Sequence, residues 1–282
     1  MKGIVYKKNA DKFSVYVNEK TFVLTARKNL KDQGVFVGDV IDFDENENII
    51  NKIFDRKNLL VRPPIANLDK MFIVICEVPK PDLYLVDKMI LFCFIYKIQP
   101  ILVINKCDEN SLGFVNEIEN IYKNVLKIIK ISAKTQNFED FLENLEGVCT
   151  LAGQSAVGKS SIINAIFNEN LEVIGDLSKK VDRGKQTTRI VTLYKFDKNK
   201  YLADTAGFSK LDERLIDIDY HDLKNYYPDF LEISKGCKYR TCMHETKKDC
   251  NVFLEKEKGN ISKIRYENYI KLLNVLKNIK RY

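Results

Sequence analysis

Eight consecutive residues in the middle of this chain have the types and spacing of a phosphate-binding loop. The segment Gly153-Gln154-Ser155-Ala156-Val157-Gly158-Lys159-Ser160 fits G-x-x-x-x-G-K-[ST] at every fixed position. In such a loop backbone N–H groups close around a phosphate, the lysine neutralises the phosphates, and the serine hydroxyl ligates Mg²⁺. An apolar stretch (148–152) precedes the loop and a helical stretch (161–167) follows it, as the motif requires. We predict that residues 153–161, including Ser161, bind nucleotide phosphates, with Lys159 also catalytic.

A second motif, upstream of this loop, could select the base of the nucleotide. Asn105-Lys106-Cys107-Asp108 fits N-K-x-D and follows the apolar stretch 101–104, at the strand end where ligands bind in α/β sheets. The Asp108 carboxylate can accept hydrogen bonds from the ring N–H and the exocyclic amine of guanine, whereas adenine presents an acceptor at the matching ring nitrogen. Ser132-Ala133-Lys134 follows another predicted strand, and a backbone N–H there can reach the guanine carbonyl oxygen. N-K-x-D alone would be interpreted as a surface turn, but the two segments together favour guanine and disfavour an ATPase.

Two further segments could respond to the terminal phosphate. Asp204 ends a short apolar stretch and begins Asp204-Thr205-Ala206-Gly207, where we expect Asp204 to hold Mg²⁺ through water and the Gly207 N–H to contact the γ-phosphate. The other segment, which lies between the phosphate loop and Asp204, is Arg183-Gly184-Lys185-Gln186-Thr187-Thr188-Arg189. A threonine in such a segment can ligate Mg²⁺ only while the γ-phosphate is present. We favour Thr188 as the magnesium ligand beside Ser160, with Thr187 as the alternate.

A cluster of metal-binding residue types lies near the C-terminus. Cys237-x4-Cys242-x-His244-x5-Cys250 offers three thiolates and one imidazole, which is typical of a tetrahedral, structural zinc site. The chain has seven cysteines and only two histidines, and one of those histidines falls inside the cluster. The alternative, a redox role, is disfavoured because reducing conditions leave such thiols free to bind metal. We predict one structural Zn²⁺.

Three kinds of domain are needed to position these residues. Residues 1–66 alternate apolar and polar in five short stretches, which predicts a small β-barrel that ends at Arg62-Pro63-Pro64. Residues 67–215 alternate short apolar stretches, such as 71–78, with helical stretches, which predicts an α/β domain with a largely parallel sheet. Residues 216–282 are polar and predict a mainly helical zinc-binding domain.

The order of the motifs is reversed relative to an ordinary GTP-binding domain, in which the phosphate loop precedes N-K-x-D. Between them, Phe138, Phe141, Leu142 and Leu145 fall on one face of a predicted helix. Gly147 is a predicted C-cap of that helix, and the next strand leads directly into the phosphate loop. A helix that normally ends such a domain is therefore joined to the strand that normally begins it.

Composition places the chain among folded proteins of the cytoplasm. A hydrophobic fraction of 45% is sufficient for packed cores. The longest apolar run (89–96) is far shorter than the roughly 20 residues of a membrane span, and no signal-peptide core begins the chain. We therefore expect a cytoplasmic protein that does not bind membranes. The net charge of +7 is concentrated in the two flanking domains, which suits an RNA-associated surface but is weak evidence alone.

Taken together, these motifs resemble those of the bacterial RsgA (YjeQ-type) family of small ribosomal subunit biogenesis GTPases, whose core is circularly permuted. The resemblance covers essentially the whole chain and includes Gly38-Asp39 in the predicted barrel. It implies an N-terminal OB-fold, a permuted P-loop GTPase core that uses GTP with Mg²⁺, and a C-terminal zinc domain. It also implies binding to the small (30S) ribosomal subunit and its 16S rRNA during late maturation, with hydrolysis stimulated by that particle and coupled to release. We expect a monomer.

One position departs from the family pattern. Members often carry a catalytic histidine just before the Thr-Thr pair, and this chain has Gln186 there. Phe208, which follows Asp204–Gly207, cannot orient a water molecule as the glutamine of Ras-like proteins does. Our hypothesis is that Gln186 positions the attacking water. The alternative, that Gln186 is only a loop residue and the ribosome supplies the catalytic contact, has nearly equal weight.

Two functions remain open from the sequence. The first is an enzyme whose hydrolysis of GTP triggers release from the maturing particle. The second is an RNA-binding assembly protein that uses GTP as a ligand switch with incidental turnover. In both, the segment Asp204–Gly207, which would act as the second switch, continues through residues 208–227 into the zinc domain. We therefore expect the γ-phosphate state to reorient that domain relative to the barrel.

Overall fold

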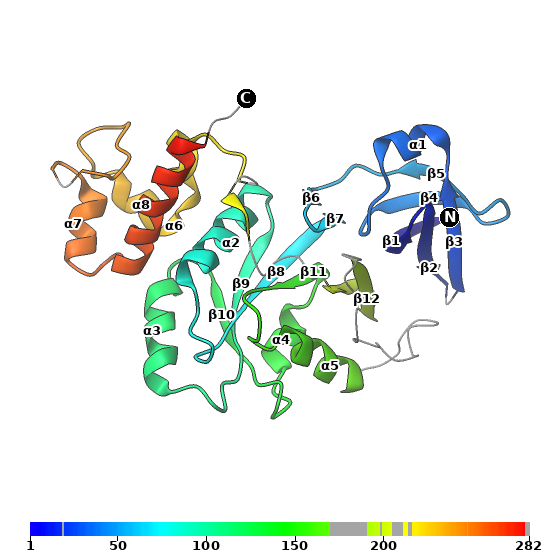
Figure 1. Ribbon diagram of the computed structural model, residues 1–282, viewed down its shortest axis with the longest axis horizontal. Coiled ribbons are helices and arrows are strands. Elements are labelled where there is room, and N and C mark those ends of the chain that lie inside the picture. Colours follow the sequence, from blue (N-terminus) through cyan, green and yellow to red (C-terminus); the bar gives the residue numbers. More distant parts are fainter. Residues whose placement is uncertain are drawn as a thin grey trace.

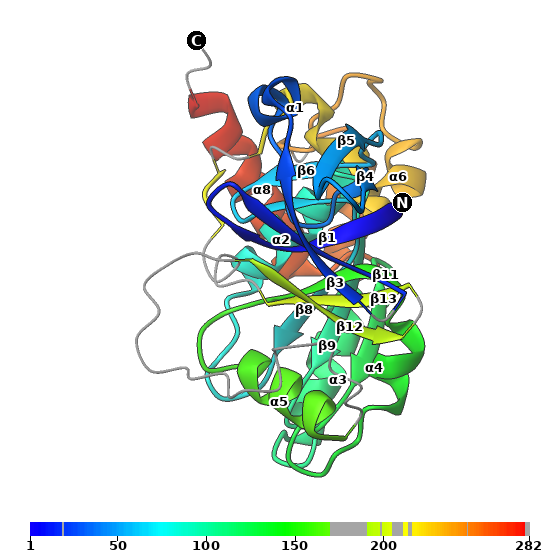
Figure 2. The same cartoon turned by 90° about the vertical axis from the view of Figure 1, so that its right-hand side faces the viewer.

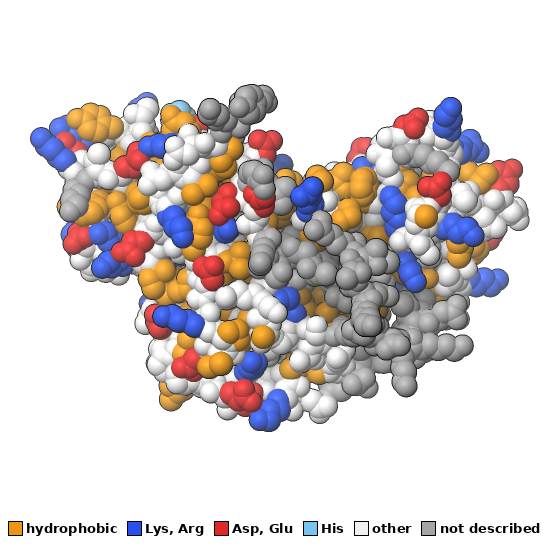
Figure 3. Space-filling view, in the orientation of Figure 1, with side chains coloured by type: hydrophobic (Ala, Val, Ile, Leu, Met, Phe, Trp, Pro, Cys, Tyr) orange, Lys and Arg blue, Asp and Glu red, His pale blue; other side chains and the backbone are white. Residues whose placement is uncertain are grey.

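The computed structural model describes residues 1–18, 20–169, 191–197, 199–204, 211–213, 216–246 and 248–279. Three domains lie in a row: an N-terminal barrel, a central sheet with helices on both faces, and a helical C-terminal domain (Figure 1). In the space-filling view the outer domains rise on either side of the central one, so this edge of the molecule is concave (Figure 3). On the same face, basic and acidic side chains of the described residues are interspersed (Figure 3).

The N-terminal domain is a closed barrel, as predicted, with the strand order β1-β2-β3-β5-β4 and β1 paired again with β4. Alternate residues point inward, such as Phe13 and Val15 on β2 and Ile41 and Phe43 on β4, because successive side chains of a strand face opposite sides. Closure leaves no unpaired edge among these five strands, which is consistent with an OB-fold. The elements are β1 (Lys2–Asn9), β2 (Lys12–Val17), β3 (Lys20–Ala26), α1 (Lys28–Gln33), β4 (Val40–Asp44) and β5 (Ile49–Ile53).

Gly38-Asp39, part of the family resemblance, lies where the barrel meets the segment that leaves it. That segment forms a hairpin of β6 (Leu59–Val61) and β7 (Pro64–Ala66). Gly38 has φ of 91°, and a Cβ there would lie 2.1 Å from the backbone oxygen of Ala66, so only glycine fits. Asp39 is fully buried and pairs with Arg56 at 2.6 Å. The two residues therefore hold the segment that leaves the barrel against the barrel itself.

The central domain is a doubly covered sheet, as the sequence predicted. Its strands run in the order β10-β9-β8-β11-β13-β12, and all neighbouring pairs are parallel except β12 with β13. Along β8, Met71 and Ile73 belong to the core cluster under α2 and α3, whereas Phe72 belongs to the cluster under α4 and α5. Both faces are apolar because both are covered. The elements are β8 (Leu68–Ile75), α2 (Leu83–Ile95), β9 (Gln99–Ile104), α3 (Leu112–Tyr122), β10 (Lys127–Lys130), α4 (Glu139–Asn144), β11 (Gly147–Ala152), α5 (Lys159–Glu169), β12 (Thr192–Asp197) and β13 (Lys200–Asp204).

The joint that permutes the domain is also present. Helix α4 carries Phe141 into the core, and the chain then passes directly into β11 and the phosphate loop. The predicted C-cap was wrong in one detail, because the cap of α4 is Leu145 and Gly147 is the first residue of β11. Gly147 has φ of 65°, and a Cβ there would lie 2.1 Å from the Asp69 carboxylate. The glycine is therefore needed for the entry into the strand.

The barrel and the central sheet are continuous. Strand β12 pairs with β13 on one side and with β1 of the barrel on the other, through Lys7 and Thr192 (Figure 2). The Lys195 ammonium also lies 5.2 Å from the centre of the Tyr16 ring on β2. The strand that follows the predicted switch segment 183–189 is therefore the strand that joins the two domains.

The C-terminal domain packs its helices around a separate core and against α2. Its elements are a 3-10 helix η3 (Tyr220–Tyr226), α6 (Pro228–Ser234), α7 (Asn251–Glu257) and α8 (Lys263–Asn278). The side chain of Leu91 on α2 is part of this core, which fixes the domain to the central one. No helix in the described part of the chain is long and apolar enough to cross a membrane.

A buried ionic network at the same interface joins α2 to α6 and α8. Arg265 of α8 is 1% exposed, and its guanidinium lies 2.6 Å from Asp87 of α2 and 2.8 Å from Asp229 of α6. Asn268 donates a further hydrogen bond to Asp87 at 2.6 Å. Burial alone would lower the pKa of Arg265, but the two carboxylates hold that pKa well above its ordinary value. Arg265 therefore keeps its charge, and its two ion pairs fix the C-terminal domain to α2.

Replacing Arg265 with methionine is expected to lower the free energy of unfolding by about 3–5 kcal/mol, because Asp87 and Asp229 would lose their buried cation. Thermal or denaturant unfolding measures the loss. The matched control is Lys263→Met, on the same helix, whose exposed pair with Glu267 spans 3.8 Å and should contribute little. Equal unfolding of the two variants would contradict this interpretation of the network.

Candidate nucleotide site and metal centre

The predicted phosphate loop connects β11 to α5, and both of its fixed glycines have a steric reason. Gly153 has φ of 132°, and a Cβ there would lie 2.3 Å from the backbone oxygen of Val74. Gly158 has φ of 94°, and a Cβ there would lie 2.3 Å from the side-chain nitrogen of Asn105. The loop can therefore approach β8 and the N-K-x-D segment only with glycine at both positions.

Lys159 begins α5 and folds its side chain back over the loop. Its ammonium donates hydrogen bonds to the backbone oxygens of Gly153, at 2.7 Å, and of Gln154. Burial lowers the pKa of Lys159. The cation is thus held against the loop whose backbone N–H groups would face a phosphate.

Side-chain hydrogen bonds join the two segments that are predicted to read the base (residues 105–108 and 132–134) to each other, and one of them to the phosphate loop. Asn105 is 1% exposed, and its side-chain nitrogen donates to the backbone oxygen of Val157 at 2.9 Å. The Ser132 hydroxyl donates to the Asp108 carboxylate at 2.6 Å, and this bond lowers the pKa of Asp108. Lys134 lies 3.9 Å from the same carboxylate. Asp108 is therefore an ionised acceptor in a fixed orientation.

These segments line one cavity of about 280 Å³. Asp108 and Ser132 lie on its wall together with Gly158 and Ser161 of the phosphate loop, so segments predicted to hold a base and its phosphates share one space. Glu109 also lines the cavity, and no motif position indicated it. The complete lining is Asn105, Lys106, Asp108, Glu109, Ser132, Ala133, Lys134, Gly158 and Ser161. Cys107, the third residue of the N-K-x-D segment, does not line the cavity. Its backbone N–H donates a hydrogen bond to the backbone oxygen of Ile131.

The predicted switch residues are only partly described. Asp204 is the last residue of β13, and β13 runs parallel to β11, the strand that leads into the phosphate loop. The strand end therefore places the Asp204 backbone beside the start of that loop. Four predicted residues lie outside the described part of the chain: Gln186, Thr187, Thr188 and Gly207.

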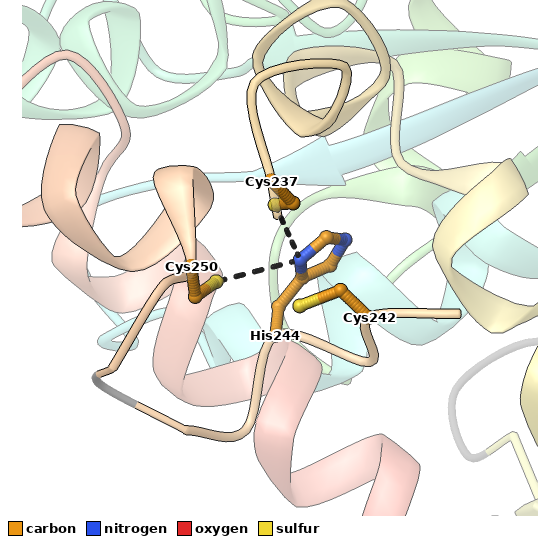
Figure 4. A group of neighbouring side chains, drawn as sticks. All are labelled: Cys237, Cys242, His244 and Cys250. Carbon is orange, nitrogen blue, oxygen red and sulfur yellow. Dashed lines mark hydrogen bonds between the residues drawn. The ribbon is translucent and has the colours of Figure 1, made fainter. Parts of the chain in front are cut away.

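The structure brings the four predicted metal ligands together (Figure 4). The ligand atoms of Cys237, Cys242, His244 and Cys250 all lie within 4.8 Å of one another. The His244 Nδ1 atom lies 3.7 Å from the Cys237 sulfur and 3.6 Å from the Cys250 sulfur. Ligands of tetrahedral zinc are separated by roughly 3.3–3.8 Å, as bond lengths of about 2.0–2.3 Å require. The two nitrogen–sulfur distances fall in this range, so the cluster is compatible with one zinc ion that uses Nδ1 as its imidazole ligand.

The C-terminal domain builds this cluster from several elements. Cys250 is the N-cap of α7, and Tyr266 and Tyr269 of α8 donate hydrogen bonds to the backbone oxygens of His244 and Met243, at 2.7 and 3.0 Å. Burial lowers the pKa of His244 to about 4, so the imidazole is neutral and able to bind a metal at pH 7. Among the described residues, the buried Nε2 atom of His244 has no hydrogen-bond partner. The neutral, buried imidazole favours a metal ligand over a charged surface histidine.

The sheet, the phosphate loop and the preceding base-reading segment define the class of the protein: it is a circularly permuted P-loop GTPase, an enzyme that hydrolyses GTP. The chain belongs to the RsgA GTPase family, whose family model matches residues 53–214.

Similar proteins extend the match to the flanking domains. The chain is 37% identical over 259 residues to "Small ribosomal subunit biogenesis GTPase RsgA" of Thermotoga petrophila, covering 88% of this chain and 86% of the relative. It is 34% identical to the protein of that name from Staphylococcus aureus (strain MRSA252), covering 99% and 98%. Among solved structures, YjeQ from Thermotoga maritima matches with a TM-score of 0.82 and 32% identity, over 99% of both chains. YloQ, described as a circularly permuted GTPase, matches with a TM-score of 0.77 and 26% identity, over 100% of this chain and 96% of the other.

Proposed function

We propose that this protein hydrolyses GTP on the small (30S) ribosomal subunit during its late maturation, and that hydrolysis is coupled to its release. The observation that carries the nucleotide part is the single cavity shared by Asp108 and the phosphate loop. The ribosomal part is supported by relatives that are named as small ribosomal subunit biogenesis GTPases. A cytoplasmic location would follow from such a partner.

In this proposal each segment of the site has one task. Asp108 accepts hydrogen bonds from guanine, Ser132 holds the Asp108 carboxylate, and Lys134 screens its charge. Lys159 turns from the loop oxygens to the phosphates, where it stabilises the negative charge that develops in the transition state. Ser160, Thr188 and Asp204 would hold Mg²⁺ directly or through water, and the metal would supply positive charge beside the phosphates. Thr187 or Thr188 and Gly207 would respond to the terminal phosphate.

The three domains would divide the work at the boundaries that the sequence indicates. Residues 1–66 would bind 16S rRNA as an OB-fold, residues 67–215 would bind and hydrolyse GTP, and residues 216–282 would hold one Zn²⁺ through the Cys237 cluster. Zinc would stabilise this last domain, because the four ligands lie in the non-helical segment between α6 and α7, which a metal would hold in place. The interspersed charges on the face in Figure 3 do not favour that face as the rRNA surface.

A GTPase assay with purified small subunits tests the proposal. We expect slow hydrolysis by the protein alone and a rate increase of at least about 10-fold when mature small subunits are added, as for GTPases that gain a catalytic contact from a partner. Large subunits serve as the control particle. A rate that is equal with small subunits, large subunits or neither would contradict the ribosomal part and leave the nucleotide site untouched.

Release distinguishes an enzyme-driven cycle from a ligand switch. If hydrolysis triggers release, the protein should remain on the small subunit with a non-hydrolysable GTP analogue and leave it with GTP. Equal release with both nucleotides would instead favour the RNA-binding assembly protein in which turnover is incidental. Sedimentation of the particles through a sucrose cushion measures the bound fraction.

Gln186 provides a separate prediction about catalysis. If its side chain positions the attacking water, Gln186→Ala should lower subunit-stimulated kcat by about 10²-fold and leave GDP affinity unchanged. Gln186→His, which installs the residue that family members often carry, should retain most of the rate. A near-normal rate for Gln186→Ala would eliminate this role and favour a catalytic contact from the ribosome.

Contacts of α2 indicate how the nucleotide state could reach the zinc domain. The Lys88 ammonium on α2 donates to the backbone oxygen of Leu211 at 2.9 Å and to Glu213 at 2.8 Å, just beyond the Asp204–Gly207 motif. Asp87, the residue directly before Lys88 on α2, pairs with Arg265. We infer that the zinc domain and α2 move together relative to the barrel. A Gly-Ser spacer after Leu211 tests the coupling, which fails if ribosome binding keeps its nucleotide dependence.

A further inference from the structure

The base-reading loop (residues 105–110) has a conformation that needs support from outside. Lys106 has φ of 60°, in the left-handed region that is strained for a residue with a Cβ. Its backbone oxygen accepts the N–H groups of Glu109 and Asn110, at 2.8 and 3.0 Å, which closes a tight turn. Asp108 lies inside this turn, so the direction of its carboxylate depends on the turn remaining closed.

The side-chain amide of Asn110 supplies such support from a position outside the cavity lining. Its nitrogen donates to the backbone oxygen of Asn105 at 2.8 Å, which ties the end of the loop to its beginning. Its oxygen accepts the backbone N–H of Glu77 at 3.0 Å, which ties the loop to the segment after β8. Asn110 is half-buried, and both halves of its amide are used.

Glu77 is itself fixed, so the Asn110 amide is attached to a rigid partner. The Glu77 carboxylate accepts hydrogen bonds from the Ser111 backbone N–H at 2.6 Å and from the Ser111 hydroxyl at 2.9 Å, at the start of α3. The Lys106 ammonium donates to the Val78 backbone oxygen at 2.9 Å. The two loops are thus joined by side chains from both, and neither Glu77 nor Asn110 lines the cavity.

We propose that Asn110 is a positioning residue for guanine recognition, which holds the turn so that Asp108 faces the base. The inference rests on the proposed role of Asp108. Ser132 holds the carboxylate and Asn110 holds the backbone that carries it, so the two act on Asp108 independently. Without the amide, the competent turn becomes one of several conformers, and the apparent affinity falls in proportion to its population.

The test compares Asn110→Ala and Asn110→Asp with the wild-type protein. Asn110→Asp keeps an acceptor for the Glu77 N–H but places a carboxylate oxygen against the Asn105 oxygen, so it should be at least as harmful as alanine. We expect each to raise the Kd for N-methylanthraniloyl-GDP about 10-fold, the effect of losing one or two hydrogen bonds. IDP lacks the amine that Asp108 would bind, so the ratio of the Kd for IDP to the Kd for GDP should fall in both variants. At saturating GTP, kcat should be unchanged because the phosphate loop is intact.

Asn120→Ala is the matched control, since Asn120 is exposed on α3 and its side chain accepts only a surface hydrogen bond from Lys123 at 3.3 Å. Nucleotide-free Asn110→Ala should melt within about 2 °C of this control, because a half-buried hydrogen bond contributes little to global stability. The inference is overturned if Asn110→Ala binds GDP as tightly as the wild type. It is also overturned if the loss of affinity is accompanied by a matching loss of melting temperature, which would indicate a merely structural residue.

A xanthine-binding background separates this inference from the proposed function. When Asn110→Ala is added to the Asp108→Asn variant, it should weaken binding of N-methylanthraniloyl-XDP. The factor should equal the one by which Asn110→Ala weakens GDP binding in the otherwise wild-type protein. If Asp108→Asn does not change base preference at all, the proposed role of Asp108 fails. If it does change and Asn110→Ala has no effect in either background, only the positioning role fails.

Discussion

Replacing Asp108 with asparagine is expected to weaken GDP binding by roughly 10²-fold or more and to create affinity for XDP. The carboxylate accepts from both the ring N–H and the exocyclic amine of guanine, whereas an asparagine nitrogen opposes one of these donors. Xanthine carries a carbonyl oxygen where guanine carries the amine, so the same nitrogen becomes a suitable donor. A site that hydrogen-bonds its ligand rejects the mismatched analogue strongly because buried polar groups are left unpaired.

Competition of GDP, XDP and ADP against a fluorescent nucleotide measures this exchange. Asp140→Asn, an exposed aspartate on α4, is the control for the chemical change alone and should keep the wild-type preference. Melting temperatures should be similar for both variants, because Asp108 is outside the packed core. A variant that retains GDP affinity would show that Asp108 does not read the base.

Removing Cys250, one of the four proposed metal ligands, is expected to have the largest effect on stability. Cys250→Ala deletes one donor of the four and the sulfur that accepts the Phe253 N–H at 3.4 Å. Structural zinc binding provides roughly 10 kcal/mol in small domains, so its loss should lower the melting temperature of the C-terminal domain by more than about 10 °C. Chelation of the wild-type protein should reproduce the same shift.

Zinc content measured by mass spectrometry, together with thermal unfolding, checks this expectation. The wild type should hold one equivalent of zinc and Cys250→Ala should hold much less. Cys93→Ala is the control, because Cys93 is a fully buried cysteine of α2 that lies 3.5 Å from the Met71 sulfur, far from the cluster in sequence. It should keep its zinc and lose only about 1 kcal/mol to the small cavity. A full zinc equivalent in Cys250→Ala would contradict the assignment of the site.

The chemistry of the site was accessible from the sequence because each motif is short. The phosphate loop, N-K-x-D and the Cys/His cluster each place their groups within one short segment, the longest of them the 14 residues from Cys237 to Cys250. The barrel and the parallel sheet were equally accessible, since alternation and fully apolar strands report directly on which faces are buried. The motif order then indicated the permutation, which β11 and the joint after α4 confirm.

Other features depended on residues that meet only after folding. Arg265 and Asp87 are 178 residues apart, and nothing in either neighbourhood predicts a fully buried ion pair. Nor does the local sequence predict the hydrogen bond between Glu77 and Asn110 or the pairing of β12 with β1. Gly147, which the sequence predicts as a helix cap, is instead the entry to β11, where the Asp69 carboxylate occupies the place of a side chain.

Features that the sequence predicts differ from those that need the tertiary structure in how far apart the interacting residues lie along the chain. Ligand chemistry and strand or helix periodicity act over short stretches of covalently linked residues, so the sequence alone determined the residue types of the candidate nucleotide and metal sites. Contacts between distant segments depend on which surfaces pack together, and many partners are chemically suitable for any one buried charge or amide. Only the tertiary structure therefore decided how Asp108 is held, how the barrel joins the central sheet, and how the zinc domain is fixed to α2.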